Sequence, residues 1–135
     1  MIKVNKKIEY SLLVLDILYR NPDKLFSAKE ISLHYRIAFD SVSRVMQKLS
    51  KKGFLVSEQG PSGGYKLKDN LNNISILSLI TVVSGPLTIA RCLKGDCDQE
   101  FACNIKTPIE KLNEKLEIFY ADISIAELFQ LNDDK

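Results

Sequence analysis

The chain has 135 residues, with 19 Lys+Arg, 17 Asp+Glu and one His, for a net charge of +2. This length suits one compact domain, or a small domain with an added dimerisation element, and excludes a large multidomain enzyme. The longest apolar run, 74–83, is interrupted by polar residues and is shorter than the ~20 residues of a membrane span. Because the N-terminal segment has no apolar core or small-residue cleavage site, we expect a cytoplasmic protein with no membrane partner.

Positive charge is concentrated in the first half of the chain. Residues 1–70 contain 13 Lys/Arg and seven Asp/Glu, a net charge of +6, whereas residues 71–135 contain six and 10, a net charge of −4. Such an asymmetry suggests that the first half meets a polyanion. An unevenly charged solvated surface explains the same numbers, so composition alone leaves both interpretations open.

The first 35 residues predict two helices. Residues 8–19 place apolar side chains at steps of three and four, which is typical of a helix with a wide apolar face. The Asn-Pro-Asp segment 21–23 should end that helix. Ser27 and Glu30 have the spacing of a capping box, so a short second helix should run to about Tyr35.

A third helix should begin near Ala38 or Asp40 and end before Gly53. Its apolar residues recur at helical spacing and should form a buried stripe: Val42, Val45, Met46 and Leu49. Two short helices joined by three or four residues form a helix-turn-helix pattern. This pattern alone is weak, because many helical proteins contain it.

The segment after the third helix strengthens the helix-turn-helix interpretation. Residues 54–57 and 65–67 read as two short strands, and the Gly-Pro-Ser-Gly-Gly segment 60–64 reads as a tight turn between them. A helix-turn-helix followed directly by a glycine-tipped hairpin is a winged helix. The predicted fold class is therefore mainly α with a small β-hairpin wing, and the winged helix-turn-helix domain is assigned to residues 1–70.

Residues 71–135 should hold the cysteine loop and the dimerisation helices. Ser75 can cap a helix that ends before Gly85, and Thr107-Pro108 should open a long helix. Apolar residues alternate along that helix in steps of four and three: Ile105, Ile109, Leu112, Leu116, Phe119 and Ile123. This heptad seam favours helix pairing in a dimer over packing within one subunit, because charged residues leave only a narrow apolar strip. Residues 124–129 should form a short closing helix.

The polar face of the third helix is the predicted DNA-reading surface. Arg and Gln side chains recognise guanine and adenine in the major groove, and Ser and Lys contact bases or phosphates. The candidate residues on this face are Ser41, Ser43, Arg44, Gln47 and Lys48. The wing tip, Ser62, Gly63 and Gly64, should lie over the adjacent minor groove. A merely solvated helix face is the competing interpretation, and the wing together with the +6 half favours DNA.

Three cysteines, Cys92, Cys97 and Cys103, lie within 12 residues. Structural zinc sites usually pair cysteines two residues apart, and this segment has no such pair. Three thiolates in a glycine-containing loop suit an iron–sulfur cluster, which needs a fourth ligand from elsewhere. A thiol-only redox switch remains the alternative.

The chain resembles the small bacterial winged-helix iron–sulfur transcription regulators of the IscR/NsrR type. The resemblance is carried by three segments: 10–18, 60–65 and 91–103. The resemblance covers essentially the whole chain. It implies a homodimer with crossed long helices. It also implies a cluster between the cysteine loop of one subunit and the first helix of the other.

The resemblance also bears on the fourth ligand. IscR-type proteins place a His three residues after the last cysteine, where this chain has Lys106. The four-and-five cysteine spacing looks like the NsrR type, which implies Glu9 of the partner subunit as the ligand. His34 is the alternative, because a related redox-sensing member uses a histidine at this place. The same spacing favours [4Fe–4S] over [2Fe–2S].

The sequence therefore predicts a transcriptional repressor that binds a palindromic promoter in double-stranded DNA as a homodimer. Its cluster would sense nitric oxide, redox state or iron–sulfur status, with nitric oxide or oxygen as the small-molecule signal. Two alternatives stay open: a cluster-free thiol regulator of the same fold, and an iron–sulfur storage or assembly partner. An enzyme is not expected, since the chain has no Ser-His-acid arrangement and no phosphate-binding glycine loop.

Overall fold

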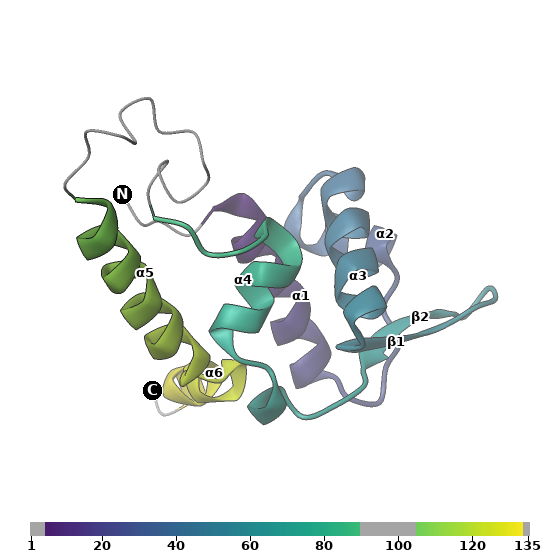
Figure 1. The fold of residues 1–135 in the computed structure, drawn as a ribbon. Helices are drawn as coiled ribbons and strands as arrows, with labels where there is room; N and C mark the ends of the chain where they lie inside the picture. Colours follow the sequence, from purple (N-terminus) through teal and green to yellow (C-terminus); the bar gives the residue numbers. More distant parts are fainter. Residues whose placement is uncertain (1–4, 90–104, 134–135) are drawn as a thin grey trace.

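The computed structural model describes residues 5–89 and 105–133. The first part of the chain forms three helices, α1 (Lys6–Arg20), α2 (Ala28–Tyr35) and α3 (Phe39–Lys52). They are followed by an antiparallel hairpin of β1 (Leu55–Glu58) and β2 (Gly64–Leu67). The three helices pack together and the hairpin extends away from them (Figure 1). The predicted mainly helical winged-helix fold is confirmed.

In the second part, every named element of the described residues is a helix or a helical turn. A single 3-10 turn, η1 (Leu71–Asn73), leads into α4 (Ile76–Ser84). Helices α5 (Lys106–Ala121) and α6 (Ile125–Asp133) complete the fold. No helix in the described ranges is long and apolar enough to cross a membrane.

Helix α1 begins two residues earlier than the apolar pattern predicts, because its cap lies outside that pattern. The Asn5 side chain accepts a hydrogen bond from the backbone N–H of Ile8 at 3.0 Å, so the helix starts at Lys6. Ser11 is fully buried, and its hydroxyl donates to the Ile8 carbonyl at 2.7 Å. A serine on the buried face is thereby satisfied without interrupting the apolar packing.

The predicted capping box of α2 is confirmed. The Glu30 N–H donates to the Ser27 hydroxyl at 3.1 Å, and the Ser27 N–H donates to the Glu30 carboxylate at 3.2 Å. Arg36 ends the helix in the left-handed region, with a φ of 57°. The turn to α3 is therefore short, as a helix-turn-helix requires.

Helix α3 buries the predicted stripe, with Val42, Val45, Met46 and Leu49 at most 4% exposed. Of the two proposed starts, Ala38 is the cap and makes no side-chain hydrogen bond. Asp40 lies in the first turn, where a carboxylate favours the positive end of the helix. Gly53 ends the helix with a φ of 93°, as predicted for a C-terminal glycine.

The wing has an additional backbone partner that the sequence did not reveal. Phe26 exchanges two hydrogen bonds with Tyr65, at 3.0 and 2.8 Å, and so acts as a third, single-residue strand beside β2. Gly64 has a φ of 155°, and a Cβ there would lie only 2.7 Å from the Phe26 backbone. Glycine at this position is therefore required by the packing of the hairpin itself.

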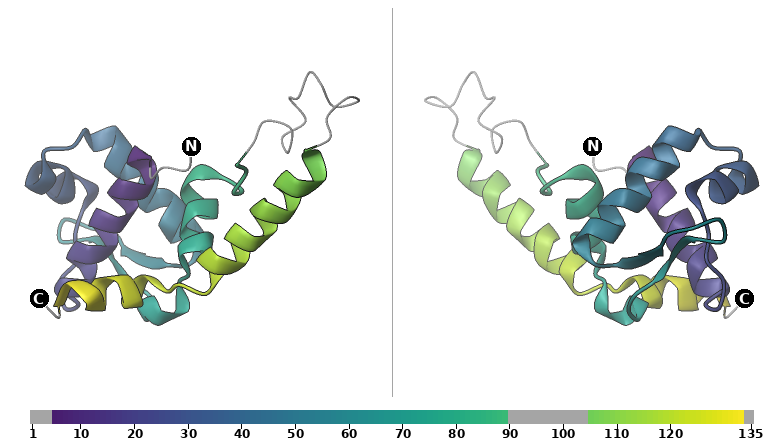
Figure 2. Two further views of the ribbon diagram at one scale, coloured as in Figure 1. Left: turned by 90° about the vertical axis from the view of Figure 1, so that its left-hand side faces the viewer. Right: turned by 90° about the vertical axis from the view of Figure 1, so that its right-hand side faces the viewer.

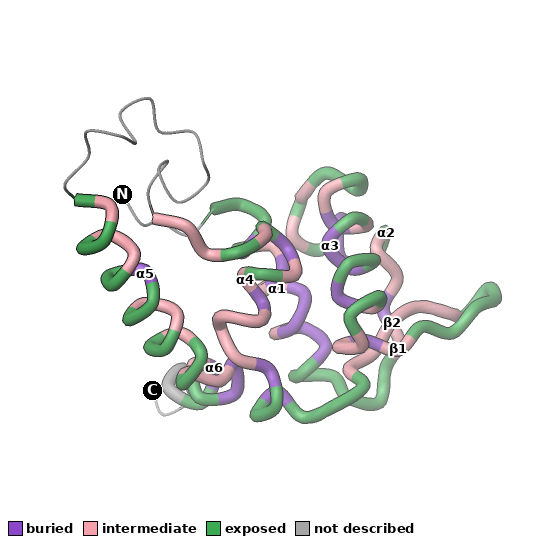
Figure 3. The backbone as a smooth tube through the Cα atoms, in the orientation of Figure 1, coloured by how far each residue is buried: buried purple, intermediate pink, exposed green. Residues whose placement is uncertain are grey.

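One hydrophobic core joins the two halves of the chain. Leu15, Leu18 and Leu49 of the winged helix belong to the same buried cluster as Leu79 of α4 and Ile125 of α6. The buried segments lie where α1, α3, α4 and α6 meet (Figure 3). The assignment of separate roles to residues 1–70 and 71–135 stays a prediction.

Helix α5 is the exception to this burial. It extends away from the other helices (Figure 2), and its buried residue is Asn113. Three residues of the predicted seam are exposed: Ile105 (60%), Leu112 (48%) and Phe119 (58%). Ile118, which is not part of the heptad pattern, is 65% exposed. The other three seam residues are half-buried, so the apolar strip is only partly covered within one subunit.

The seam is shorter in the helix than the heptad pattern indicates, because α5 ends at Ala121. Ile123 lies beyond the helix, and its carbonyl accepts a hydrogen bond from the Ile76 N–H at 2.8 Å. Ser75 and Ser124 form an isolated antiparallel bridge at the same place. This pairing turns the chain toward α6, which begins at Ile125 after a Ser124 hydroxyl cap.

Candidate nucleic-acid interface and sensor residues

The outward face of α3 carries the predicted DNA-reading side chains. Arg44, Gln47 and Lys48 are exposed, and Ser41 and Ser43 are half-buried. The Gln47 amide donates to the Ser43 hydroxyl at 3.2 Å, which holds the two side chains together on one face. Arg44 and Gln47 therefore lie on the side of α3 opposite its buried stripe, and the other three candidates, Ser41, Ser43 and Lys48, lie on the flanks of that side.

Positive charge on this helix is not neutralised by neighbouring carboxylates. Arg44, Lys51 and Lys52 form no ion pair with any described residue. The Lys48 ammonium instead donates to the backbone carbonyl of Val83, at the end of α4, at 3.4 Å. A cationic helix face without internal partners is what a polyanionic ligand requires.

At the wing tip, Ser62 is exposed and both Gly63 and Gly64 are half-buried. A side chain at Gly63 would overlap the carbonyl oxygen of Glu58. The packing of the hairpin therefore requires glycine at both positions, whether or not the backbone approaches DNA. Ser62 is the one of the three whose side chain is available at the surface.

The candidate cluster ligands are only partly within the described residues. Cys92, Cys97 and Cys103 lie outside them. Glu9 is exposed in the first turn of α1, and its carboxylate makes no hydrogen bond or ion pair with the described part of the chain. In that part, no three His, Cys, Asp or Glu side chains gather as a metal-binding group.

His34 lies in the last turn of α2. Its side chain is exposed, and its ring packs edge-on against Tyr35 with a centroid separation of 4.7 Å. Burial, together with the Asp16 carboxylate, raises the pKa of the Tyr35 hydroxyl. The described residues thus place an aromatic neighbour, and no other candidate ligand, against His34.

The end of α4 connects the candidate sensor helix to the DNA-reading helix. The Asn5 amide, which caps α1, donates to the Ser84 hydroxyl at 3.1 Å. The neighbouring Val83 carbonyl receives the hydrogen bond from Lys48 of α3. Sequence analysis missed this junction, because its residues are separated by 35 to 79 positions.

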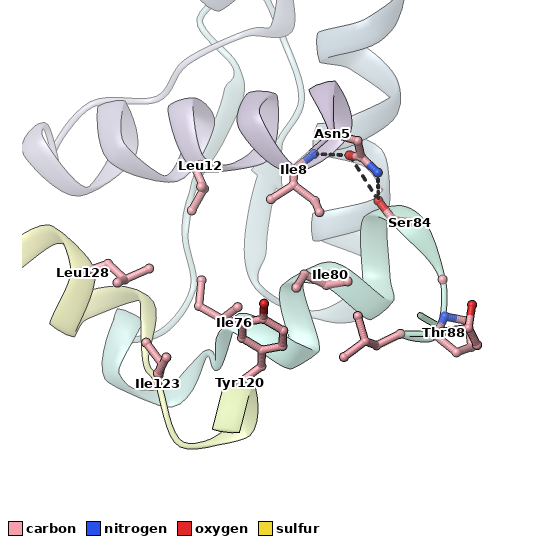
Figure 4. Close-up of a pocket in the computed structure, with 13 residues that line it drawn as sticks. Asn5, Ile8, Leu12, Ile76, Ile80, Ser84, Thr88, Tyr120, Ile123 and Leu128 are labelled. Atoms are coloured by element: carbon pink, nitrogen blue, oxygen red, sulfur yellow. Dashed lines mark hydrogen bonds between the residues drawn. The ribbon is translucent and has the colours of Figure 1, made fainter. Parts of the chain in front are cut away.

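An apolar cavity of about 490 Å³ lies beside this junction, between α1, α4, α5 and α6. Leu12 of α1, Ile76 and Ile80 of α4 and Tyr120 of α5 point toward it (Figure 4). The Asn5–Ser84 contact lies at one end of the cavity (Figure 4). Leu12 of this cavity also lines a second hollow, which contains Glu9.

The chain is similar to known transcriptional regulators in sequence. Residues 4–131 match the family model of Rrf2, described as an iron-dependent transcriptional regulator. The chain is 27% identical over 133 residues to the HTH-type transcriptional regulator IscR of Vibrio campbellii, covering 97% of this chain and 79% of that protein.

Two solved structures share the fold. CymR, the global cysteine regulator of B. subtilis, has a TM-score of 0.70 at 19% identity, covering 95% of this chain and 96% of that one. IscR of T. potens has a TM-score of 0.68 at 22% identity, covering 99% and 89%. The named relatives are regulators and not enzymes, and the chain belongs to the Rrf2 family of DNA-binding transcriptional regulators.

Proposed function

We propose that this chain is a cytoplasmic, homodimeric repressor that binds a palindromic promoter site in double-stranded DNA. The outward face of α3 carries the proposal, because Arg44 and Gln47 are exposed on a helix whose other face is buried. Such a helix fits the major groove, where Arg recognises guanine and Gln recognises adenine. Ser41, Ser43 and Lys48 would contact neighbouring bases or phosphates.

The wing would supply a second contact, in the adjacent minor groove. Ser62 is exposed at the tip of the hairpin, and Gly63 and Gly64 keep the tip narrow. The +6 charge of residues 1–70 supports their assignment as the DNA-binding part. Residues 71–135 would then provide the sensor and the dimer contact.

The exposed apolar strip of α5 supports dimerisation. Leu112, Ile118 and Phe119 are 48–65% exposed along one 16-residue helix. Pairing this strip with its copy would remove it from water, at about 25 cal/mol for each Å² of apolar surface. A two-fold dimer would also place two α3 helices against two half-sites of a palindrome.

An iron–sulfur cluster, with [4Fe–4S] favoured over [2Fe–2S], is the sensor in this proposal. Cys92, Cys97 and Cys103 would hold it together with Glu9 of the partner subunit, and His34 is the alternative fourth ligand. The donor set fits, since thiolates suit iron and the exposed Glu9 carboxylate is free of partners among the described residues. When bound, the cluster supplies reactivity toward nitric oxide, oxygen or iron loss.

The junction at the end of α4 offers a route from Glu9 to the DNA-reading helix. Glu9 lies in the first turn of α1, one turn from the cap Asn5, which is hydrogen-bonded to Ser84. Lys48 of α3 is hydrogen-bonded to the adjacent Val83. A displacement of α1 would therefore reach α3 through two hydrogen bonds and change the fit to the half-sites.

A cluster-free thiol regulator is the second candidate. It is favoured by the structural likeness to CymR, the global cysteine regulator of B. subtilis, and by the three clustered cysteines. An iron–sulfur storage or assembly role is less well supported, because the named relatives are transcriptional regulators.

Anaerobic purification tests the sensor. We expect a brown protein with stoichiometric iron and sulfide, and loss of both in Glu9→Ala. The control Glu127→Ala removes an exposed carboxylate from α6 and should keep the cluster. A colourless wild-type protein would favour the thiol regulator. An unchanged cluster spectrum in Glu9→Ala would contradict the Glu9 assignment and direct the test to His34→Ala.

DNA binding is tested by selecting duplexes from a random pool with the purified dimer. We expect an enriched palindrome whose retention falls steeply with added salt. The cluster-loaded and cluster-free forms are then compared on that duplex. Failure to enrich any sequence would contradict the repressor proposal.

A further inference from the structure

A second basic surface lies between the first turn of α1, the N-terminal half of α3 and the end of α4. A cavity of about 370 Å³ there is lined by Lys6, Lys7 and Tyr10 from α1, together with residues of α3 and Val83. Three of the α3 residues, Ser41, Arg44 and Lys48, also belong to the DNA-reading face. The lysines of α1 thus share one cavity with that face.

The charges around this cavity are not compensated inside the described chain. Lys6, Lys7 and Arg44 are exposed and form no ion pair with any described carboxylate, and the Lys48 ammonium contacts only a carbonyl oxygen. Four cations around one hollow repel each other, and this repulsion is relieved when an anion lies among them. The Tyr10 and Ser41 hydroxyls, both half-buried, add neutral hydrogen-bond donors.

The carboxylates of α1 face elsewhere. Glu9 and Asp16 line a separate hollow with Leu128 and Phe129 of α6. Arg20 also lines this second hollow and is ion-paired with Asp16 at 2.9 Å. The carboxylates of α1 therefore lie away from the cavity that Lys6 and Lys7 line. The positive end of the α1 dipole also lies at the basic cavity, because Lys6 and Lys7 are the first two residues of the helix.

The cavity and the wing lie on opposite sides of the DNA-reading helix. In Figure 1, α1 and α4 are on one side of α3 and the hairpin extends from the other. A duplex that receives α3 in its major groove presents a phosphate backbone on both sides of that groove. The wing accounts for one side, and nothing in the proposed function yet accounts for the other.

We infer that Lys6 and Lys7 of α1, with Lys48 of α3, form a clamp for a DNA backbone phosphodiester on the side of α3 away from the wing, beside the base-reading Arg44. This inference rests on the proposed DNA-binding function and extends it to α1. The helix that carries Glu9 would then contact DNA directly, in addition to acting through the junction at Ser84.

The salt dependence of DNA affinity tests this clamp. A fluorescein-labelled duplex of about 30 base pairs and mixed sequence is titrated with the full-length protein over a chloride series, and binding is followed by anisotropy. Each lost phosphate contact lowers the slope of log Kd against log salt by about 0.9. We expect Lys6→Gln/Lys7→Gln to lower this slope by about 1–2 for each subunit, equally on any sequence.

Two further variants separate the clamp from general effects of charge. Lys6→Arg/Lys7→Arg keeps both charges and should keep the wild-type slope. Lys111→Gln/Lys115→Gln removes two exposed lysines from α5 and should also keep it. Circular dichroism and sedimentation confirm that each variant is folded and retains the wild-type oligomeric state.

The outcomes distinguish the clamp from the proposed function. A wild-type slope in Lys6→Gln/Lys7→Gln, or an equal loss in the α5 control, would overturn the clamp and leave the DNA-binding proposal intact. If the wild-type protein retains no duplex even at low salt, both the proposed function and the clamp are wrong.

Discussion

Helices α3 and α5 differ in how far their apolar residues are buried. In α3, Val42 and Leu49 are completely buried, whereas in α5 Leu112 and Phe119 are 48% and 58% exposed. Both helices carry apolar residues at helical spacing, so the sequence pattern alone does not separate them. The difference indicates that α3 completes a core within one subunit, while α5 presents a surface that one subunit leaves open.

The exposed charged residues also differ between α3 and α5. The exposed side of α3 carries Arg44 and three lysines without carboxylate partners among the described residues. On α5, Lys111, Glu114 and Lys115 alternate in sign along the exposed surface. A surface of one sign suits a polyanion, whereas a mixed surface beside an apolar strip suits a protein partner.

The largest expected effect comes from removing a core side chain. Leu49→Ala should lower the free energy of unfolding by about 3 kcal/mol, because the leucine is fully buried between packed helices. The half-exposed Leu112→Ala should lower it by less than about 1 kcal/mol at concentrations where the protein is monomeric. Urea unfolding measures both variants, and equal losses would remove the contrast between α3 and α5.

Charge placed on the α5 strip should separate the subunits. Leu112→Lys/Phe119→Lys buries two ammonium groups in the proposed interface, so the dimer Kd should rise by about 100-fold or more, near 2.7 kcal/mol. Sedimentation velocity over a dilution series measures this change. Glu127→Lys alters an exposed charge on α6, outside the strip, and should remain dimeric. A dimer that persists in the double variant would place the interface elsewhere.

Truncating the DNA-reading arginine should weaken specific binding. Arg44→Ala is expected to cost about 2 kcal/mol on the selected duplex and to relax the preference at one base pair of each half-site. Lys51→Ala should instead weaken binding uniformly across sequences, because a lysine of this kind contacts phosphate. Competition with singly substituted duplexes distinguishes the two, and a uniform loss in Arg44→Ala would make it a phosphate contact.

The smallest expected effect is at the cap of α2. Ser27→Ala should cost about 1 kcal/mol at neutral pH. The Ser27 N–H, assisted by Lys24, lowers the pKa of the Glu30 carboxyl below its ordinary value of 4.5. The stabilisation from ionised Glu30 is therefore complete above that ordinary value and is lost as the pH falls through the lower folded pKa. In Glu30→Gln, the free energy of unfolding should no longer fall at acid pH through this group. Urea unfolding between about pH 3 and pH 7 measures the change. A pH profile identical to that of the wild-type protein would contradict the role of Glu30.

Local signals predicted most of the winged helix correctly. The Ser27–Glu30 spacing, the Val42–Leu49 stripe and Gly53 each specify a cap, a buried face or a helix end within a few residues. These features depend on hydrogen bonds and steric limits between near neighbours, so the residue types are sufficient. The outward placement of Arg44 follows, because the buried stripe fixes the opposite face.

Long-range contacts were not predictable in the same way. The Phe26–Tyr65 strand pairing, the Asn5–Ser84 contact and the Lys48–Val83 contact join residues 35 to 79 positions apart. Nothing in the residue types at either end indicates the partner. The position of the two wing glycines at the tip of the hairpin predicts a contact with DNA, and the packing against Phe26 and Glu58 adds a reason that depends on the folded hairpin.

By itself, the sequence determined the order of the helices, the wing, the polar face of α3 and the excess positive charge of residues 1–70. Tertiary structure decided that α4 and α6 complete the core of the winged helix, that part of the apolar strip of α5 stays exposed, and that Lys6 and Lys7 share a cavity with Arg44. The physical reason is that periodicity and capping act over one or two helical turns, whereas burial and charge convergence depend on which distant surfaces meet.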